Sequence, residues 1–298
     1  YDRGFAVGIT AASSTIGPII PPSLPLIIYG VVAEVSIGQL FAAGLGPGLL
    51  MALALMIMVH VLAVRRGYPR DRAFARRELL GLFGRALLPL FAPILIIGGI
   101  VFGIFTPTEA AVAAVVYTLL VGGLAFRTLD WRTVWAILVE TAEITASILM
   151  IVASAALFAW VLTLNQVAVD LAGLLTGVTE NPTLLLLLIM LLVFVVGFFL
   201  ETIAAITILA PLVLPVATAA GIDPVHLGIV LVLNLMIGLL TPPVGMVLYV
   251  LAKVSRLPFE ECVRATLPFL VPLVVVLLLL VVFPSLALWL PGVVYPSG

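Results

Sequence analysis

Glu201 carries the only charge in the apolar stretch 183–220, and its carboxylate is the first group to consider for chemistry. An ionisable side chain at membrane depth costs at least about 2.5 kcal/mol, so it is a functional hypothesis by default. Such a carboxylate can balance a bound cation. The alternative is a local role, in which Glu201 caps the following helix. Thr202 and Thr207 are further candidate ligands, although their hydroxyls could instead bond to their own helix.

Pairs of adjacent prolines occur twice in apolar stretches, each time beside hydroxyl and glycine residues. Each proline removes a backbone donor and clashes with the preceding turn, so neither helix should be continuous. In hydrocarbon, backbone groups freed in this way are tolerated only where protein or a water-filled cavity satisfies them. The breaks are therefore predicted binding regions. The first cluster consists of Ser14, Thr15, Gly17, Pro21, Pro22 and Ser23, and the second of Asn234, Gly238, Thr241, Pro242, Pro243 and Gly245.

The chemistry of these clusters favours a hard cation. Hydroxyl, carboxylate and backbone oxygens without a cysteine or histidine cluster suit Na⁺ rather than a transition metal. Gly17 leaves room for a close approach of the backbone. Asn234 has an alternative role as a hydrogen-bonding contact between helices. Which individual oxygens would bind Na⁺ is left open by the sequence.

The elements that must position these residues are membrane helices. The chain has 298 residues, of which 64% are hydrophobic and 9% charged. Soluble domains carry about 25% charged residues, so we predict an all-α polytopic membrane protein. The single cysteine, Cys262, excludes an internal disulfide framework. No Walker sequence is present, and we expect no ATP, no nucleic acid and no cofactor besides a coupling ion.

Basic residues give the orientation of the spans. All thirteen Lys and Arg residues lie outside the apolar stretches, which fall at about 4–33, 41–64, 87–105, 108–126, 141–163, 183–220, 225–252 and 266–290. A span needs roughly 20 residues. By the positive-inside rule, the connecting segments that contain Lys and Arg are cytoplasmic. The connections without basic residues are then external, namely 34–40, 106–108, 164–182 and 221–224.

The stretch 183–220 is too long for one straight crossing. Such a helix would measure about 57 Å at 1.5 Å per residue, against a hydrocarbon core of about 30 Å. A single crossing would also place Lys253 and Arg256 outside. We therefore predict a re-entrant hairpin that enters and leaves from the external side, with its tip near 197–205. Two full crossings preserve the orientation too, but they place Glu201 in a cytoplasmic turn without a basic neighbour.

Two polar segments are predicted to be interfacial. The basic segment 65–86 is expected to be a cytoplasmic connector with an amphipathic helix. The segment 130–144 carries Trp131 and Trp135, which suit the membrane boundary, and leads into the next span. Glu109 follows a proline at an external helix start, where its charge complements the helix dipole.

The two proline pairs belong to an internal repeat. "TIGPIIPPSLPLIIYGVVAEVS" (15–36) resembles "NLMIGLLTPPVGMVLYVLAKVS" (234–255), with a proline pair, then Tyr, then Ala-x-Val-Ser. The charge pattern makes the two copies antiparallel. Inverted repeats with correspondingly broken helices point to a secondary transporter's site near the middle of the membrane. The first broken helix is expected within 1–40 and the second within 225–255.

Several motifs in order resemble one family. "AASSTIGPIIPPS" (11–23), "GIFTPTEAAVAAVVY" (103–117), "GFFLETIAAITILAPLVLP" (197–215) and "GIDPVHLGIVLVLNLMIGLLTPPVG" (221–245) carry the resemblance. They are similar to the large membrane subunit of tripartite ATP-independent periplasmic (TRAP) transporters, the DctM-type permease. The resemblance runs from residue 1 to about 290.

The resemblance implies an inverted-repeat transporter whose halves each contain a hairpin and a broken helix. The first half's hairpin would lie before Tyr1, so the sequence is expected to be a C-terminal portion of a single permease domain, residues 1–298. Family members often have Gly where Ser14 stands, and some have Asp where Glu201 stands. An elevator-like movement of the hairpin-containing module is implied as well.

The implied function is secondary active transport of a small organic anion, such as a carboxylate, coupled to Na⁺ or H⁺. The implied partners are a periplasmic solute-binding protein and a small four-helix membrane subunit, in an inner membrane whose lipid surrounds them. No Lys or Arg lies within the predicted site, so helix N-termini, hydroxyls and bound cations would have to hold the anion.

Three other functions compete with this one. The first is a stand-alone dicarboxylate or citrate Na⁺ symporter with similar hairpins. The second is a channel-like or structural membrane subunit. The third is an intramembrane enzyme using Glu201 and His226, which fails to explain the inverted repeats. If the protein is not an enzyme, as we expect, His226 is predicted to lie at the membrane interface.

Overall fold

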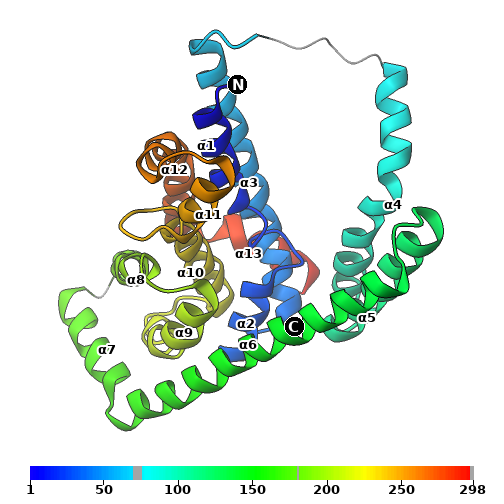
Figure 1. Ribbon diagram of the computed structural model, residues 1–298. Coiled ribbons are helices and arrows are strands. Elements are labelled where there is room, and N and C mark those ends of the chain that lie inside the picture. The colour runs from blue at the N-terminus through cyan, green and yellow to red at the C-terminus, as the bar shows by residue number, and fades with distance from the viewer. Residues whose placement is uncertain (70–75, 180, 296–298) are drawn as a thin grey trace. The chain divides into compact units, whose positions relative to one another are not determined.

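The computed structural model describes residues 1–69, 76–179 and 181–295, and within these ranges the chain is helical without strands (Figure 1). Glu180 and part of the predicted connector 65–86 lie outside the described residues. Five helices are long and apolar enough to cross a membrane by length and composition, including Ile37–Arg65 and Phe259–Val282. The predicted all-helical class is thereby confirmed.

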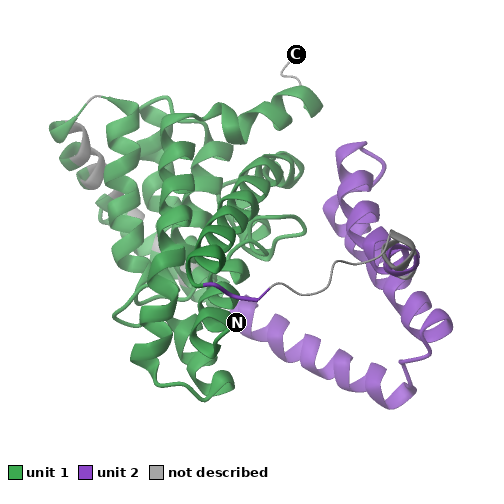
Figure 2. Ribbon diagram, turned by 90° about the horizontal axis from the view of Figure 1, so that it is seen from above, with its two compact units in different colours: residues 1–66, 151–298 green, residues 67–150 purple. Residues whose placement is uncertain are grey.

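Two compact units, coloured green and purple in Figure 2, make up the chain. Unit 1 contains residues 1–66 and 151–298, and unit 2 contains residues 67–150. The helices of unit 2, with α6 continuing past its end, are α4 (Arg76–Val101), α5 (Pro107–Leu120), the π-helix η1 (Val121–Ala125) and α6 (Trp131–Leu164). Those of unit 1 are α1 (Arg3–Ser14), α2 (Leu24–Val32), α3 (Ile37–Arg65), α7 (Val167–Val178), α8 (Pro182–Gly197), α9 (Thr202–Ala219), α10 (Pro224–Gly238), α11 (Met246–Ser255), α12 (Phe259–Val282) and α13 (Ser285–Val294).

Local sequence determines where most helices of unit 1 begin. At the starts of α1, α2, α3, α8, α9 and α10, a side chain accepts a hydrogen bond from the N–H groups of the first turn, which have no partner inside the helix. A proline follows in the first turn of α2, α8 and α10, where its missing N–H removes no helical hydrogen bond. The capping residues are Asp2, Ser23, Ser36, Asn181, Glu201 and Asp223.

Helix α10 is the centre of unit 1. Every residue from Val225 to Gly238 is buried. A helix that is apolar on all sides belongs in the interior of a packed structure. Around it lie α2, α3, α8, α9, α12 and α13, and Figure 1 shows α8 and α9 on one side of it. The elements that carry the predicted site residues are thus arranged around one helix.

The segment between α1 and α2 rests on two glycines of α3. A Cβ on Gly44 would collide with the backbone carbonyl oxygen of Ile19, and a Cβ on Gly48 would collide with the side chain of Ile20. The two glycines are one helical turn apart, so they present a smooth strip to the segment. Any larger residue at Gly44 would displace the backbone between the first two helices.

Unit 2 is held together by aromatic and capping contacts. The Tyr117 hydroxyl on α5 donates to the Leu88 carbonyl on α4 over 2.8 Å, and its ring lies 5.4 Å from that of Phe91. Thr106 and Glu109 form a reciprocal capping box at the start of α5. Glu109 therefore has a local role at a helix start.

Two stretches differ from the sequence prediction. The predicted external loop 164–182 contains α7, whose Val, Leu and Ala residues extend the helical pattern beyond the preceding span. The predicted single span 266–290 is divided, since α12 ends at Val282 and α13 begins at Ser285. Phe283 leaves the helical conformation there, with φ -122° and ψ 80°, because the residue before a proline is driven out of the α region.

We predict that Gly44→Ala destabilises the protein by about 1–3 kcal/mol, because the new methyl group meets a backbone carbonyl that cannot rotate away. Gly292→Ala on α13 is the matched control, since nothing lies within 4 Å of its added Cβ. Thermal unfolding of both variants in detergent measures the difference. Equal melting temperatures would show that α3 does not define the path of the first interrupted segment.

Candidate functional site

The first proline pair lies in a non-helical segment between α1 and α2. α1 ends at Ser14 and α2 begins at Leu24, and the peptide bond between Pro21 and Pro22 is cis. Ser23 connects the two sides, since its hydroxyl donates to the Pro18 carbonyl and accepts from the Leu26 N–H. The segment therefore ends in a defined cap rather than in a loose loop.

The hydroxyls at the end of α1 are already partnered by their own helix. Ser14 and Thr15 each donate over 2.7 Å to the carbonyl three residues earlier. Thr15 is buried, whereas Ser14 is exposed. A Cβ on Gly17 would meet only the Ser14 carbonyl at 3.8 Å, so packing within the chain does not require glycine there. Each hydroxyl oxygen still has lone pairs that could accept or coordinate.

The second proline pair lies between α10 and α11. α10 ends at Gly238, and the Thr241 hydroxyl donates to the Ile237 carbonyl over 2.8 Å. The peptide bond between Pro242 and Pro243 is cis. Gly245 begins α11 with φ +59°, in the left-handed region that glycine adopts without a steric penalty. Residues 239–245 thus leave backbone groups outside any helix.

Glu201 caps α9. Its carboxylate oxygen Oε2 accepts from the N–H groups of Ile203 and Ala204 over 2.9 and 3.3 Å. Within the described residues no basic side chain forms an ion pair with it. The local role considered from sequence, in which Glu201 caps the following helix, therefore has a structural basis. Capping occupies one of the two carboxylate oxygens. The other carboxylate oxygen, Oε1, has no hydrogen bond within the described part of the chain.

The two threonines after Glu201 differ sharply. The Thr207 hydroxyl bonds to the Ile203 and Ala204 carbonyls, each over 2.9 Å, so it is satisfied by its own helix. Thr202 is only 3% exposed, and its hydroxyl oxygen has no hydrogen-bond partner in the described part of the chain. A buried polar atom left unpartnered costs about 1–3 kcal/mol. Thr202 is therefore the predicted ligand whose hydroxyl is not already bonded to its own helix.

Helices α8 and α9 form a hairpin. The link from α9 to α10 is only four residues long, so the end of α9 lies near the start of α10. The start of α8 is there too, since Pro182 and Thr183 line a cavity of about 190 Å³ together with Gly221 and Asp223. Both ends of the hairpin are therefore on one side, and the turn 198–201 is on the other.

That turn lies beside the second break. A Cβ on Gly238 would meet the backbone of Gly197 at 2.9–3.2 Å, so the ends of α10 and α8 are in close backbone contact. One turn before Gly238, the Asn234 amide donates to the Met190 carbonyl over 2.6 Å. The contacts follow the same order along both helices, so α8 and α10 run in the same direction. Their C-terminal carbonyls and the N-terminus of α9 therefore gather at one place.

Asn234 itself holds the helices together. Its side chain is 1% exposed and its Nδ2 group is committed to α8. The structure thus favours the interhelical role over direct binding by the amide nitrogen. The proline pair, the hairpin turn and Thr202 remain the groups that could face a bound species.

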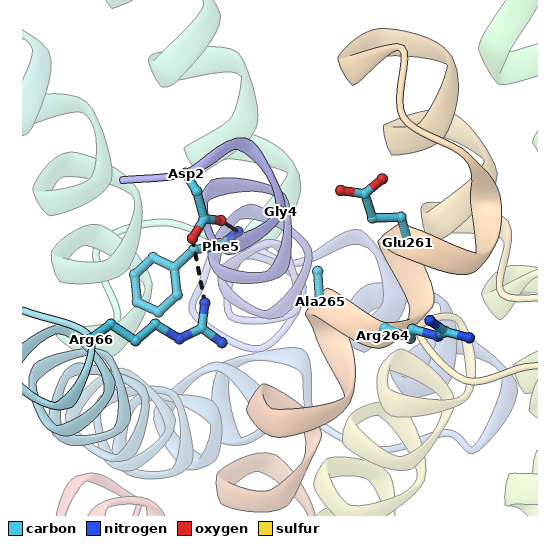
Figure 3. Close-up of a pocket in the computed structure, with 7 residues that line it drawn as sticks. All are labelled: Asp2, Gly4, Phe5, Arg66, Glu261, Arg264 and Ala265. Carbon is cyan, nitrogen blue, oxygen red and sulfur yellow. Dashed lines mark hydrogen bonds and ion pairs between the residues drawn. The ribbon is translucent and has the colours of Figure 1, made fainter. Parts of the chain in front are cut away.

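The two broken helices run in opposite directions. α1 starts beside the start of α12, where Gly4 and Phe5 line a cavity of about 220 Å³ with Glu261 and Ala265 (Figure 3). α10 starts beside the end of α12, where the His226 Nε2 atom is 2.8 Å from the Leu280 carbonyl. The first broken helix therefore begins at one end of α12, and the second begins at the other end of α12.

The cavity in Figure 3 holds its own ion pair. Asp2 caps α1 through the Phe5 N–H and pairs with Arg66 over 3.5 Å, and the Arg66 guanidinium lies 5.2 Å from the Phe5 ring centre. None of the residues that line this cavity belongs to the predicted site. The ion pair joins the start of α1 to the residue that follows α3.

His226 is not exposed at an interface as the sequence suggested, because it is only 2% exposed and bonded to α12. It also lies far from Glu201. Gly238 contacts the hairpin turn, and twelve residues of helix, about 18 Å, separate His226 from Gly238. An acid–base pair needs hydrogen-bond contact, so Glu201 and His226 do not form the catalytic pair that the enzyme alternative requires.

Sequence reasoning missed the packing residues that bring the site together. Gly197 and Gly228 allow close helix contacts, and Tyr29 is fully buried between helices. A faint signal existed, since a tyrosine follows the proline pair in both repeat copies. Nothing in one sequence shows which tyrosine meets which glycine.

Known proteins match almost the whole chain. Residues 1–286 match the model of the DctM component of tripartite ATP-independent periplasmic transporters. The chain is 47% identical over 291 residues to the sialic acid TRAP transporter large permease protein SiaM of Vibrio cholerae, covering 98% of this chain and 68% of SiaM. It is 39% identical over 292 residues to the C4-dicarboxylate large permease protein DctM of Pseudomonas aeruginosa, covering 98% and 68%.

A third relative is longer than the first two, since the match covers a smaller share of it. It is the sialic acid TRAP transporter permease protein SiaT of Haemophilus influenzae, which is 37% identical over 296 residues. The match covers 99% of this chain but only 48% of SiaT. These relatives are transporter permeases and not enzymes. With the buried helices, the two breaks and the hairpin already described, the match extends over the whole site. The chain therefore belongs to the DctM family of TRAP transporter membrane permeases.

Proposed function

We propose that this chain forms the solute pathway of a secondary active transporter for a small organic anion, coupled to Na⁺ or H⁺. Its partners would be a periplasmic solute-binding protein and a small membrane subunit. The relatives named for sialic acid and C4-dicarboxylate support an anionic solute. The single observation that carries the proposal is the meeting of the hairpin turn with the second helix break.

That meeting brings the ends of α8 and α10 and the start of α9 together. The ends of α8 and α10 direct carbonyl oxygens toward it, which suits a cation, while the N–H groups of Ile203 and Ala204 at the start of α9 bond to Glu201. Glu201 and the unpartnered Thr202 hydroxyl add a negative charge and an oxygen ligand. We propose Na⁺ coordination by oxygens of this group, with the carboxylate balancing its charge.

The first break would complete the pathway in the same way. It lies on a helix that runs opposite to the second broken helix, and in both a proline pair precedes the next helix, which Ser23 caps in the first and which follows a left-handed Gly245 in the second. These features support an inverted repeat, in which each half contributes one broken helix. Ser14, Thr15, Gly17 and Ser23 would then face the solute from the side opposite to Thr241 and Gly245.

A re-entrant hairpin agrees with the helix lengths. α8 has 16 residues and α9 has 18, which correspond to about 24 and 27 Å. α8 is shorter than a hydrocarbon core of about 30 Å, whereas α9 is one of the five helices that could cross a membrane by length and composition. A turn that stops inside the membrane would place Glu201 beside the second break, where a cation can satisfy it.

A stand-alone Na⁺ symporter is the competing proposal within transport. Uptake of sialic acid or a C4-dicarboxylate into liposomes distinguishes the two, because the tripartite system needs the binding protein and the symporter does not. Replacing Na⁺ with K⁺ or choline then tests coupling. Saturable counterflow exchange distinguishes either transporter from a channel, and non-saturable flux independent of the binding protein would contradict the proposal.

We predict that Glu201→Gln raises the Na⁺ concentration for half-maximal uptake, by about tenfold for each 1.4 kcal/mol of lost interaction. Glutamine keeps an oxygen that can cap α9, so only the formal charge is removed. Glu201→Asp should retain activity. The measurement is a Na⁺ titration of uptake by the reconstituted complete transporter.

Asp223→Asn is the matched control for Glu201. Asp223 caps α10 through two N–H groups over 2.8 and 3.1 Å, in nearly the same geometry, but at the opposite end of the hairpin. Its Na⁺ titration should therefore match that of the parent protein. If Glu201→Gln also leaves the titration unchanged, Glu201 has a capping role alone.

We predict that cysteines at Val178 and Ala219, which flank the hairpin, react with a membrane-impermeant reagent from outside. A cysteine at Thr128, next to Arg127, should react only from the cytoplasm, because basic residues are retained there. All three side chains are exposed. The background is Cys262→Ala, which removes the native buried thiol. Labelling of Val178→Cys and Ala219→Cys from opposite sides would rule out re-entrance.

A further inference from the structure

Tyr29 joins the first broken helix to the second. It lies on α2, has no exposed surface, and its hydroxyl donates to the Pro224 carbonyl at the start of α10 over 2.8 Å. The contact links residues 195 positions apart in the chain. It is therefore a long-range contact between the two halves of the repeat.

The ring of Tyr29 occupies a slot made by a glycine. A Cβ on Gly228 would collide with the Cε1 and Cδ1 atoms of the ring. Gly228 is the only glycine of α10 before Gly238. One helical turn away in either direction, the ring would meet Pro224 or Val232, whose side chains fill the position. The tyrosine therefore fits α10 at one register.

This register determines the relative height of the two breaks. Ser23, at the end of the first break, lies six residues from Tyr29, which is about 9 Å of helix. Leu239, at the start of the second break, lies fifteen residues from Pro224, which is about 22 Å. Helices are stiff over these lengths, so a slip of one turn at Tyr29 would move one break past the other by about 5 Å. That displacement exceeds the tolerance of any shared coordination site.

We propose that Tyr29, seated on Gly228, is a positioning residue that fixes the height of the first helix break relative to the second. The proposal rests on the proposed function, in which both breaks face one solute. Tyr29 does not touch that solute, and it acts through the helices that carry the site.

Tyr249 provides a control from the same repeat. It follows the second proline pair as Tyr29 follows the first, yet it is 54% exposed and its ring stacks on Phe259 at 4.3 Å. It therefore makes no comparable contact between the broken helices in the described structure. Tyr249→Phe and Tyr29→Phe remove the same hydroxyl from corresponding positions.

The direct test measures the distance between the breaks. Spin labels are attached at Leu24→Cys and Met246→Cys, the first residues of α2 and α11, in the complete transporter with Cys262→Ala. Both positions are exposed in this chain. We expect Gly228→Ala, which expels the ring, to shift or broaden the distance distribution by several Å, up to one turn. Tyr29→Phe should broaden it slightly and Tyr249→Phe should leave it unchanged.

A double variant separates positioning from general damage. Tyr29→Leu with Gly228→Ala removes the collision and refills the slot, so we expect the melting temperature to recover while the distance distribution stays broad. Thermal stabilisation by Na⁺, referenced to K⁺, should need about fivefold more Na⁺ in Tyr29→Phe and in the double variant, and the parental amount in Tyr249→Phe.

Two results would overturn the proposal. One is an unchanged distance distribution in Gly228→Ala, and the other is full recovery of both the distance and the Na⁺ requirement in the double variant. A parent protein that Na⁺ does not stabilise would contradict the proposed coupling instead. The distance measurement would still decide the role of Tyr29, because it needs no bound ion.

Discussion

Backbone groups in an apolar interior need hydrogen-bond partners, and this requirement governs the structure. Helices satisfy it almost everywhere, so the few places where they stop are conspicuous. At the first break Ser23 supplies a substitute cap, and at the hairpin turn Glu201 does so for two N–H groups. The hairpin turn and the second break lie side by side at the end of α10, where Gly238 meets Gly197. Two of the interruptions are thus brought together in one region of unit 1.

Close helix contact is the second constraint, and glycines provide it. Gly44 accommodates the first break, Gly197 and Gly238 bring the hairpin turn against the second, and Gly228 accommodates an aromatic ring. Leaving out a side chain at such positions lets backbones approach closely and lets van der Waals contact replace the hydrophobic drive that is missing among apolar surroundings. The interrupted segments are irregular in conformation and yet tightly held.

Local features were readable from the sequence, and long-range ones were not. The interruption at Pro21 and Pro22 follows from a missing donor, and the hairpin turn near Glu201 follows from length and charge. The end of α12 before Pro284 also has a local cause that the apolar composition concealed. In contrast, the bond from Asn234 to Met190 and the buried position of His226 depend on which helices become neighbours. Periodicity cannot supply that, because α10 is apolar on every side and shows no preferred face.

The complete burial of α10 has a consequence for the order of assembly during synthesis. His226 and Asn234 find their partners on α12 and α8, and α12 is made after α10. When α10 first enters the bilayer, the His226 ring has no Leu280 carbonyl to bond and the helix has lipid on the side that α12 later covers. The chain must therefore hold α10, with its His226 side chain not yet paired, incompletely packed until the C-terminal part emerges. Premature termination within α12 would leave a substrate for membrane quality-control proteases.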